Sequence, residues 1–241
     1  MSLSLHMIAA ATKVTQAPCT HFQEAEFEIT VPNAPQIALH GQSIILSCSF
    51  SVGNSWQLSS SVMTWQRGLE VIHSFYHSQD QLDRQSPHFA NRTSLFISEI
   101  SKGNASLKLD HITPEDAGIY TCSVSTQMGS QKKSFPLKIA AYYPEPRLRF
   151  SISAHGLDVF MSSEGGYPSP TLLWVTESAE DIANHTETHL TQDSNTKLYN
   201  VNSTLTLTGI TNVSVTLILR NTELHQEIRR ELDMNLISVK K

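Results

Sequence analysis

Apolar and polar residues alternate along short stretches of the first half of the chain, and turn-forming residues separate these stretches. In the segment 43–50, every second residue from Ile44 to Phe50 is apolar or cysteine. A period of two is typical of a β-strand that buries one of its faces. Many short strands joined by polar turns predict a β-sandwich. The expected strands lie at 43–50, 62–67, 104–110, 119–125 and 131–139.

Two cysteines and a tryptophan make this prediction specific. Cys48, Trp65 and Cys122 follow one another in the order typical of an immunoglobulin domain, with 74 positions between the cysteines. The run 116–122 reads D-x-G-x-Y-x-C, and its Tyr120 suits the corner tyrosine that binds upstream backbone. We therefore predict an immunoglobulin-like sandwich over 26–140 with a Cys48–Cys122 disulfide. In the chain-entropy model this bridge stabilises the fold by roughly 4 kcal/mol.

The long interval between the cysteines favours a variable-type domain, because it leaves room for two extra strands. Arg92 fits this interpretation, since it can pair with Asp116 at the lower end of the sandwich. The alternative for that pair is a solvated surface contact worth about 0–1 kcal/mol. The last expected strand lacks the Phe-Gly-x-Gly bulge of antigen receptors, so the chain is not predicted to be one.

The segment 72–122 carries a family resemblance. The run ANRTSLF at 90–96, together with GNASL at 103–107 and the D-x-G-x-Y-x-C run, resembles the variable-type domain of the B7/butyrophilin-like family of T-cell co-signalling ligands. The resemblance covers roughly 26–235, and relatives of the HERV-H-associated ligand and of the programmed-death ligands look most similar. It implies a variable-type domain, then a constant-type domain, then a transmembrane helix.

The second half of the chain departs from this pattern. The proline-bearing run 141–146 suits a hinge, and Trp174 suits the third strand of a constant-type domain over 141–235. No cysteine follows Cys122. The family pattern places Met161 and Leu217 where the cysteines would stand, and Val215 where the corner tyrosine would stand. We expect an ordinary sandwich that lacks a bridge worth about 2–5 kcal/mol; a decaying gene or a mispredicted exon is the alternative.

The two ends of the chain are expected to lie outside the domains. The stretch 1–25 has no basic residue before its apolar run, although Ala9–Ala11 offers a cleavage context, so a truncated or alternative start is favoured over a working signal peptide. This leader or disordered segment contains Cys19, a leftover thiol. The tail 236–241 is followed by no apolar span, so the chain is either secreted or lacks its membrane anchor.

Composition excludes several functional classes. The 22 acidic and 17 basic residues give a net charge of −5, which argues against a nucleic-acid partner. The hydrophobic content of 39% with 16% charged residues argues for a packed core. The run H-T-E-T-H at 185–189 lacks the H-E-x-x-H order of a zinc site. With no nucleophile motif or phosphate-binding loop, we predict no catalytic residue, metal, cofactor or small-molecule substrate.

Asn-x-Ser/Thr acceptors favour passage through the secretory route. Two to four of them are expected to carry glycans, with chance matches in this Ser/Thr/Asn-rich chain as the alternative. The acceptors are Asn91, Asn104, Asn184, Asn202 and Asn212.

The resemblance implies a protein receptor that docks on one sheet of the first domain, because receptors in this family bind the sheet of the C, C′, F and G strands. Alternation from Trp65 and Tyr120 supplies the outward positions on two strands. On the next strand, Phe75 is expected to be an exposed aromatic anchor. The predicted receptor-binding face is Thr64, Gln66, His73, Phe75, Thr121, Ser123, Ser125, Met128 and Lys133.

These observations predict an extracellular ligand, at the cell surface or secreted, that binds a receptor on T cells or other lymphocytes and modulates T-cell activation and cytokine production. Two alternatives stay open. One is an adhesion module that uses the same sheet to hold cells together. The other is a soluble decoy that competes with anchored relatives.

Overall fold

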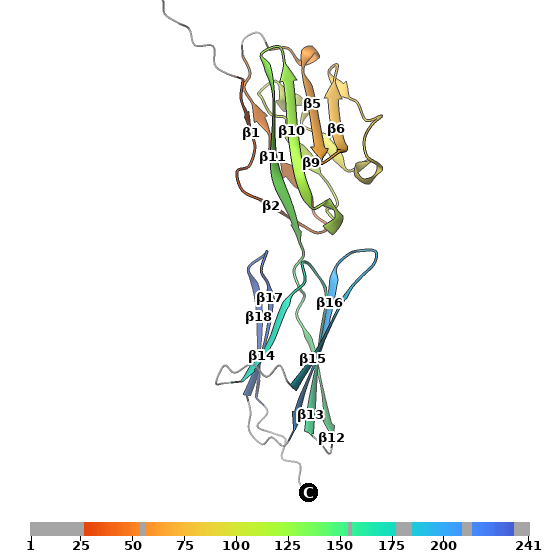
Figure 1. The fold of residues 1–241 in the computed structure, drawn as a ribbon, viewed down its shortest axis with the longest axis vertical. Helices are drawn as coiled ribbons and strands as arrows, with labels where there is room; N and C mark the ends of the chain where they lie inside the picture. The colour runs from red at the N-terminus through yellow and green to blue at the C-terminus, as the bar shows by residue number, and fades with distance from the viewer. Residues whose placement is uncertain (1–26, 54–55, 154–155, 177–184, 209–213, 234–241) are drawn as a thin grey trace, which may run out of the picture.

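The computed structural model describes residues 27–53, 56–153, 156–176, 185–208 and 214–233. The expectations for the leader 1–25, for Cys19, Asn184 and Asn212, and for the tail 236–241 lie outside these residues. The described residues form two β-sandwiches that lie end to end, with the junction just after Ala140 (Figure 1).

The first sandwich pairs a large front sheet with a smaller back layer. The front sheet has six strands, in the order β2 (Gln36–Leu39), β11 (Gly129–Ala140), β10 (Gly118–Thr126), β5 (Val62–Arg67), β6 (Glu70–Tyr76) and β7 (Gln79–Asp80). The back layer is built from β1 (Ile29–Thr30) paired with β4 (Ser49–Phe50), and from β3 (Ile44–Leu46), β9 (Leu107–Leu109) and β8 (Thr93–Leu95). Short helical turns occupy Leu58–Ser60, Pro87–Phe89, Ile97–Ile100 (α1) and Pro114–Asp116.

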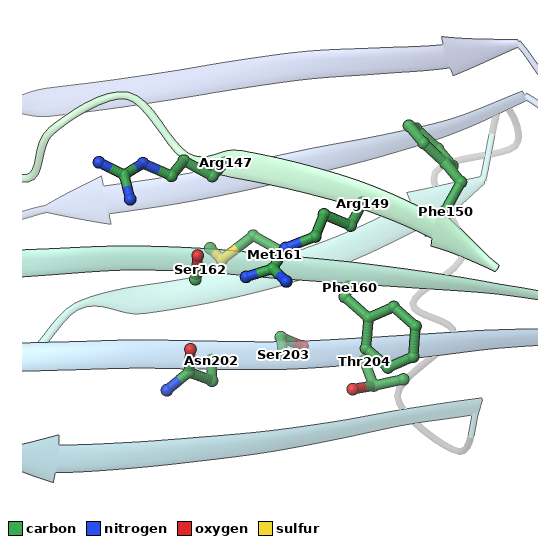
Figure 2. A pocket seen from close by; sticks show the side chains of 9 residues that line it. All are labelled: Arg147, Arg149, Phe150, Phe160, Met161, Ser162, Asn202, Ser203 and Thr204. Atoms are coloured by element: carbon green, nitrogen blue, oxygen red, sulfur yellow. The ribbon is translucent and has the colours of Figure 1, made fainter.

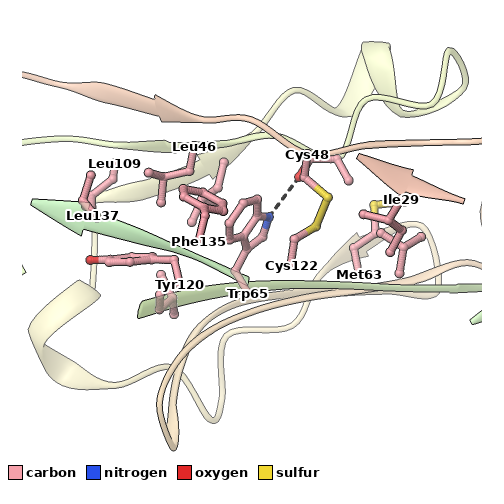
Figure 3. Packing of buried hydrophobic residues seen from close by; sticks show 14 of the residues in the cluster. Ile29, Leu46, Cys48, Met63, Trp65, Leu109, Tyr120, Cys122, Phe135 and Leu137 are labelled. Carbon is pink, nitrogen blue, oxygen red and sulfur yellow. Dashed lines mark hydrogen bonds between the residues drawn. A yellow bond between two sulfur atoms is a disulfide. The ribbon is translucent and has the colours of Figure 1, made fainter. Parts of the chain in front are cut away.

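The core of this sandwich is built around the cysteines and the tryptophan from which it was predicted. Cys48 and Cys122 form a disulfide between the two layers. Trp65 is fully buried beside it, donates a hydrogen bond from Nε1 to the carbonyl of Ala105 at 2.9 Å, and meets the ring of Phe135 edge-on (Figure 3). The β6 and β7 strands, which a constant-type domain lacks, complete the variable-type architecture.

The second sandwich has four strands in one sheet and three in the other, the strand arrangement of a constant-type domain. The four-stranded sheet is β12 (Arg147–Ser153), β13 (Gly156–Gly166), β16 (Tyr199–Thr208) and β15 (Thr186–Gln192). The three-stranded sheet is β14 (Thr171–Thr176), β17 (Ser214–Asn221) and β18 (Gln226–Asp233).

Met161 and Leu217 occupy the positions of the bridge in this second sandwich. Leu217 lies opposite Trp174 just as Cys122 lies opposite Trp65. Met161 lies opposite Ser203, whose hydroxyl accepts a hydrogen bond from Trp174 Nε1 at 3.0 Å. Both replacements are buried in the core of the domain, so apolar packing fills the space that a disulfide takes in the first sandwich.

The junction between the sandwiches is tied by backbone and side-chain hydrogen bonds. Ala141 exchanges backbone hydrogen bonds with Tyr167 of the second domain, at 2.9 and 3.0 Å. The buried Asn221 donates from Nδ2 to the carbonyls of both residues, at 2.9 and 3.0 Å. Lys138, at the end of the long strand β11, pairs with Glu223 at 2.9 Å. The hinge expected at 141–146 is thus bonded to the second sandwich at its first residue.

Candidate functional face of the first domain

The outer face of the front sheet carries most of the residues expected to bind a receptor. Along β10, Tyr120, Cys122 and Val124 are buried, so Thr121, Ser123 and Ser125 point outward. The same alternation on β5 buries Met63 and Trp65 and turns Thr64 and Gln66 outward. The outward orientation predicted for these five residues is confirmed: Thr64, Gln66, Thr121, Ser123 and Ser125.

Strand register brings these side chains into cross-strand rows. Thr121 lies between Gln66 and Ser134, and its hydroxyl is 2.8 Å from that of Ser134. Ser123 lies between Thr64 on β5 and Lys132 on β11. The centre of the face is therefore hydroxyl-rich and lies beside one cationic side chain. Such a surface offers many hydrogen-bond donors and acceptors to an incoming protein sheet.

The expected orientation of β6 is wrong. His73 lies opposite Trp65 and Phe75 lies opposite Met63, so both point into the sandwich, where each is at most 1% exposed. His73 is satisfied there, because its ring nitrogens lie 3.0 Å from the hydroxyl of Thr93 and 3.0 Å from the carboxylate of Asp80. A polar side chain with both groups hydrogen-bonded tolerates burial. Phe75 is a core residue and not an exposed anchor.

Two further predicted residues lie off the centre of the face. Met128 is half-buried against the core, and its sulfur accepts a hydrogen bond from the backbone N–H of Gly53 at 3.1 Å. Lys133 lies opposite Cys122 and so turns toward the edge beside β1, where its ammonium is 3.4 Å from the carboxylate of Glu28. The lysine that shares the outward side with Ser123 is Lys132.

Sequence reasoning missed two exposed apolar side chains on this face. Tyr76 is 42% exposed at the end of β6, and Ile119 is 62% exposed at the start of β10. The two lie at opposite ends of the hydroxyl-rich centre, because β6 and β10 run in the same direction on either side of β5. The alternation of β10 already implied an outward Ile119, since it precedes the inward Tyr120.

A buried ion-pair cluster holds the lower end of β10. Asp116 is fully buried, and both of its carboxylate oxygens bind the guanidinium of Arg92, one of them at 3.1 Å. His88 lies 2.7 Å from the same carboxylate, and the backbone N–H of Thr113 donates to it at 2.8 Å. Burial by itself raises the pKa of Asp116, but the hydrogen bonds from Arg92, Thr113 and His88 outweigh it and hold the pKa below its usual value.

This cluster confirms the predicted Arg92–Asp116 pair and shows that it is a buried contact, not a solvated one. The corner tyrosine is confirmed as well, because Tyr120 donates its hydroxyl hydrogen to the carbonyl of Asp116 at 2.8 Å. Burial and the neighbouring Asp116 charge raise the pKa of Tyr120 well above its usual value. These hydrogen bonds fix the position of the start of β10. They thereby fix the orientation of Ile119 and Thr121.

The three described glycan acceptors differ in their surroundings. Asn91 is exposed in a turn with a φ of 61°. Asn104 is half-buried, and its side-chain oxygen accepts a hydrogen bond from the N–H of Ser106 at 2.9 Å. Ser106, the hydroxyl residue of that acceptor motif, is itself buried against Cys48. Asn202 is exposed in the middle of β16. Whether any of the three carries a glycan stays a prediction.

Comparison with known proteins identifies the family to which the chain belongs. Residues 31–140 match the model of the immunoglobulin V-set domain. Residues 146–229 match the Ig-C domain model described as "Butyrophilin subfamily 3 member A2-like". The chain belongs to the B7/butyrophilin-like family. The two matched segments are the two sandwiches, so the family resemblance seen in 72–122 and the implied order of a variable-type domain followed by a constant-type domain are confirmed.

Two curated relatives illustrate this membership. Human HERV-H LTR-associating protein 2 is 33% identical over 186 residues, which are 76% of this chain and 42% of that protein. Mouse programmed cell death 1 ligand 1 is 28% identical over 169 residues, 68% of this chain and 57% of that protein. The chain thus spans about half the length of the curated relatives it matches. None of the helices in the described residues has the length and apolar character needed to cross a bilayer.

Two solved structures share the fold. Bovine butyrophilin superposes with a TM-score of 0.73 at 21% identity, covering 87% of this chain and 99% of that one. A chain from the structure of ICOS in complex with ICOS-L and an anti-ICOS-L VNAR domain gives a TM-score of 0.69 at 21% identity, covering 83% and 98%. The tandem arrangement of two sandwiches is therefore shared with both of these structures.

Proposed function

We propose that this chain is an extracellular ligand whose first domain binds a protein receptor on T cells or other lymphocytes and thereby modulates T-cell activation. Family membership supports the class of partner, since its relatives include a programmed cell death ligand and human V-set domain-containing T-cell activation inhibitor 1. The proposed docking surface is the outer face of the front sheet, centred on Thr121 and Ser123.

The observation that carries the proposal is the character of this face. Its centre presents small hydroxyl side chains from two neighbouring strands, Thr64 on β5 and Thr121 and Ser123 on β10, so another sheet can approach closely. Tyr76 and Ile119 stand exposed at its two ends and supply apolar contact area. A polar surface with a few aromatic or aliphatic anchors is typical of non-obligate interfaces, which bury about 1,600 Å² or less in weak encounters.

The function is tested with the chain fused to an antibody Fc segment and applied to activated and resting human T cells. We expect saturable binding to lymphocytes, measured by flow cytometry, and a change in cytokine release when the fusion is immobilised beside an antibody to the T-cell receptor complex. An Fc segment alone is the control.

Absence of both binding and cytokine change on every lymphocyte subset contradicts the proposal. Clustering of beads coated with the fusion, without any lymphocyte response, identifies an adhesion module instead. Competition by the soluble chain against an anchored relative, without signalling of its own, identifies a decoy.

A further inference from the structure

The outer face of the four-stranded sheet in the second domain is hollowed, and a glycan acceptor stands inside the hollow. The hollow has a volume of about 460 Å³. Arg147 and Arg149 of β12 border it on one side, and Asn202 and Thr204 of β16 border it on the other (Figure 2). Phe160 of β13 projects between them and lies opposite Thr204.

Both residues that the acceptor motif needs lie on this open side. Asn202 and Thr204 are two positions apart on one strand, so their side chains leave the same face of the sheet. Between them, Ser203 points inward and is hydrogen-bonded to Trp174. Asn202 lies opposite Ser162 on β13, one row away from the Phe160–Thr204 pair. The acceptor amide is therefore exposed on the same face of the sheet as the Phe160 ring, one row along from it.

The lining suits a sugar. The Phe160 side chain is 42% exposed, and the face of an aromatic ring carries negative electrostatic potential that attracts polarised C–H groups. Within the described part of the chain, neither Arg147 nor Arg149 pairs with a carboxylate, so both guanidinium groups keep free N–H donors beside the hollow. An N-acetyl carbonyl and ring hydroxyls accept such hydrogen bonds.

We propose that Asn202 carries an N-linked glycan whose first N-acetylglucosamine sits in this hollow against Phe160, with Arg149 as a hydrogen-bond donor. Asn202 Nδ2 forms the bond to the anomeric carbon, a polyprenyl-diphosphate-linked oligosaccharide gives up its diphosphate leaving group, and the amide loses one proton. The inference rests on the extracellular placement in the proposed function. The seated sugar covers apolar surface in the domain that lacks a disulfide.

Occupancy is measured first. The full chain is secreted from mammalian cells behind a cleavable leader, and its glycopeptides are analysed by mass spectrometry before and after peptide N-glycosidase, which converts a glycosylated Asn to Asp. We expect Asn202 to be converted in most molecules. A bare Asn202 beside an occupied Asn91 overturns the inference, because Asn91 then proves that the chain met the transferase.

The contact between the first N-acetylglucosamine and Phe160 is tested by the rate at which the same glycosidase releases the Asn202 glycan from the folded protein. We expect Phe160→Ala to speed release by roughly fivefold, the factor that a contact of about 1 kcal/mol supplies. Ile152→Ala, which removes another exposed side chain of that sheet outside the hollow, is the matched control and should leave the rate unchanged. Equal rates for wild type and Phe160→Ala contradict this contact.

A failure of the proposed function can be distinguished from a failure of this inference by one further variant. Asn202→Gln removes the glycan from the second domain and leaves the front sheet of the first domain unaltered. It should therefore bind lymphocytes as the wild type does.

Discussion

Replacing both Met161 and Leu217 with cysteine tests whether the second sandwich has the strand register of the first. The two residues take the places that Cys48 and Cys122 take around Trp65, each on the matching side of Trp174. If the correspondence holds, the two new thiols meet across the core and oxidise in the secretory route. The loop they close is about 56 residues long, for which the chain-entropy model gives a stabilisation of about 4 kcal/mol.

The substitutions also remove apolar packing. Each of Met161→Cys and Leu217→Cys deletes two buried heavy atoms, and at about 0.8 kcal/mol per buried methylene the pair loses roughly 3 kcal/mol. We therefore expect the free energy of unfolding of the bridged double variant to be about 1 kcal/mol higher than that of the wild type. In an unbridged control, Met161→Cys with Leu217→Ala, five buried heavy atoms are lost, so its free energy of unfolding should be roughly 4 kcal/mol lower than that of the wild type.

Non-reducing peptide mapping by mass spectrometry shows whether the bridge forms. Hydrogen exchange of amides in β13 and β17 then gives the opening free energy of this domain alone. If the cysteines introduced by Met161→Cys and Leu217→Cys are still free thiols after oxidation, the shared strand register is refuted. A bridge that leaves exchange as fast as in the unbridged control refutes the stability argument.

Two further changes probe the first domain. Phe75→Ala should lower the free energy of unfolding by about 3–5 kcal/mol, because the ring is core, whereas Tyr76→Ala should leave it within about 0.5 kcal/mol; denaturant titration separates the two outcomes. Asp116→Asn should cost about 3–5 kcal/mol near neutral pH, because it leaves the Arg92 charge unpaired. Because the pKa of folded Asp116 is lowered, its contribution is complete above the unfolded value of about 3.9 and is lost as the pH falls through the folded pKa. Asp116→Asn should accordingly weaken the acid sensitivity below about pH 4, and melts in which wild type and variant lose stability in parallel there would contradict this.

The sequence predicts the fold correctly at residues that have the same role in every immunoglobulin-like sandwich. Trp65, Cys48 and Cys122 identify the core, because a buried tryptophan against an inter-sheet bridge needs those residue types at that spacing. The Asp116 and Tyr120 positions were equally clear. Alternation from these fixed points then gave the outward residues of β5 and β10 correctly.

The phase of β6 could not be derived in the same way. Apolar residues occur in both phases of the run 70–76, so periodicity alone does not choose a face. Polarity does not identify the inward face either, because hydrogen bonds to Thr93 and Asp80, residues that follow in later strands, satisfy the buried His73. A register shift after Trp65 in the β5–β6 pairing also interrupts counting from the tryptophan. Such partners and shifts are set by tertiary contacts.

The most direct test of the docking surface compares two arginine substitutions on opposite sides of the first sandwich. Ser123→Arg places a long charged side chain in the centre of the front sheet, and Ile45→Arg places one at an exposed position of the back layer, where Ile45 is 53% exposed. Both variants should melt as the wild type does. Binding isotherms of the Fc fusions on activated T cells should show at least a tenfold loss for Ser123→Arg, about 1.4 kcal/mol, and none for Ile45→Arg. Unchanged binding by Ser123→Arg, or equal loss by both variants, would contradict the assignment of the front sheet.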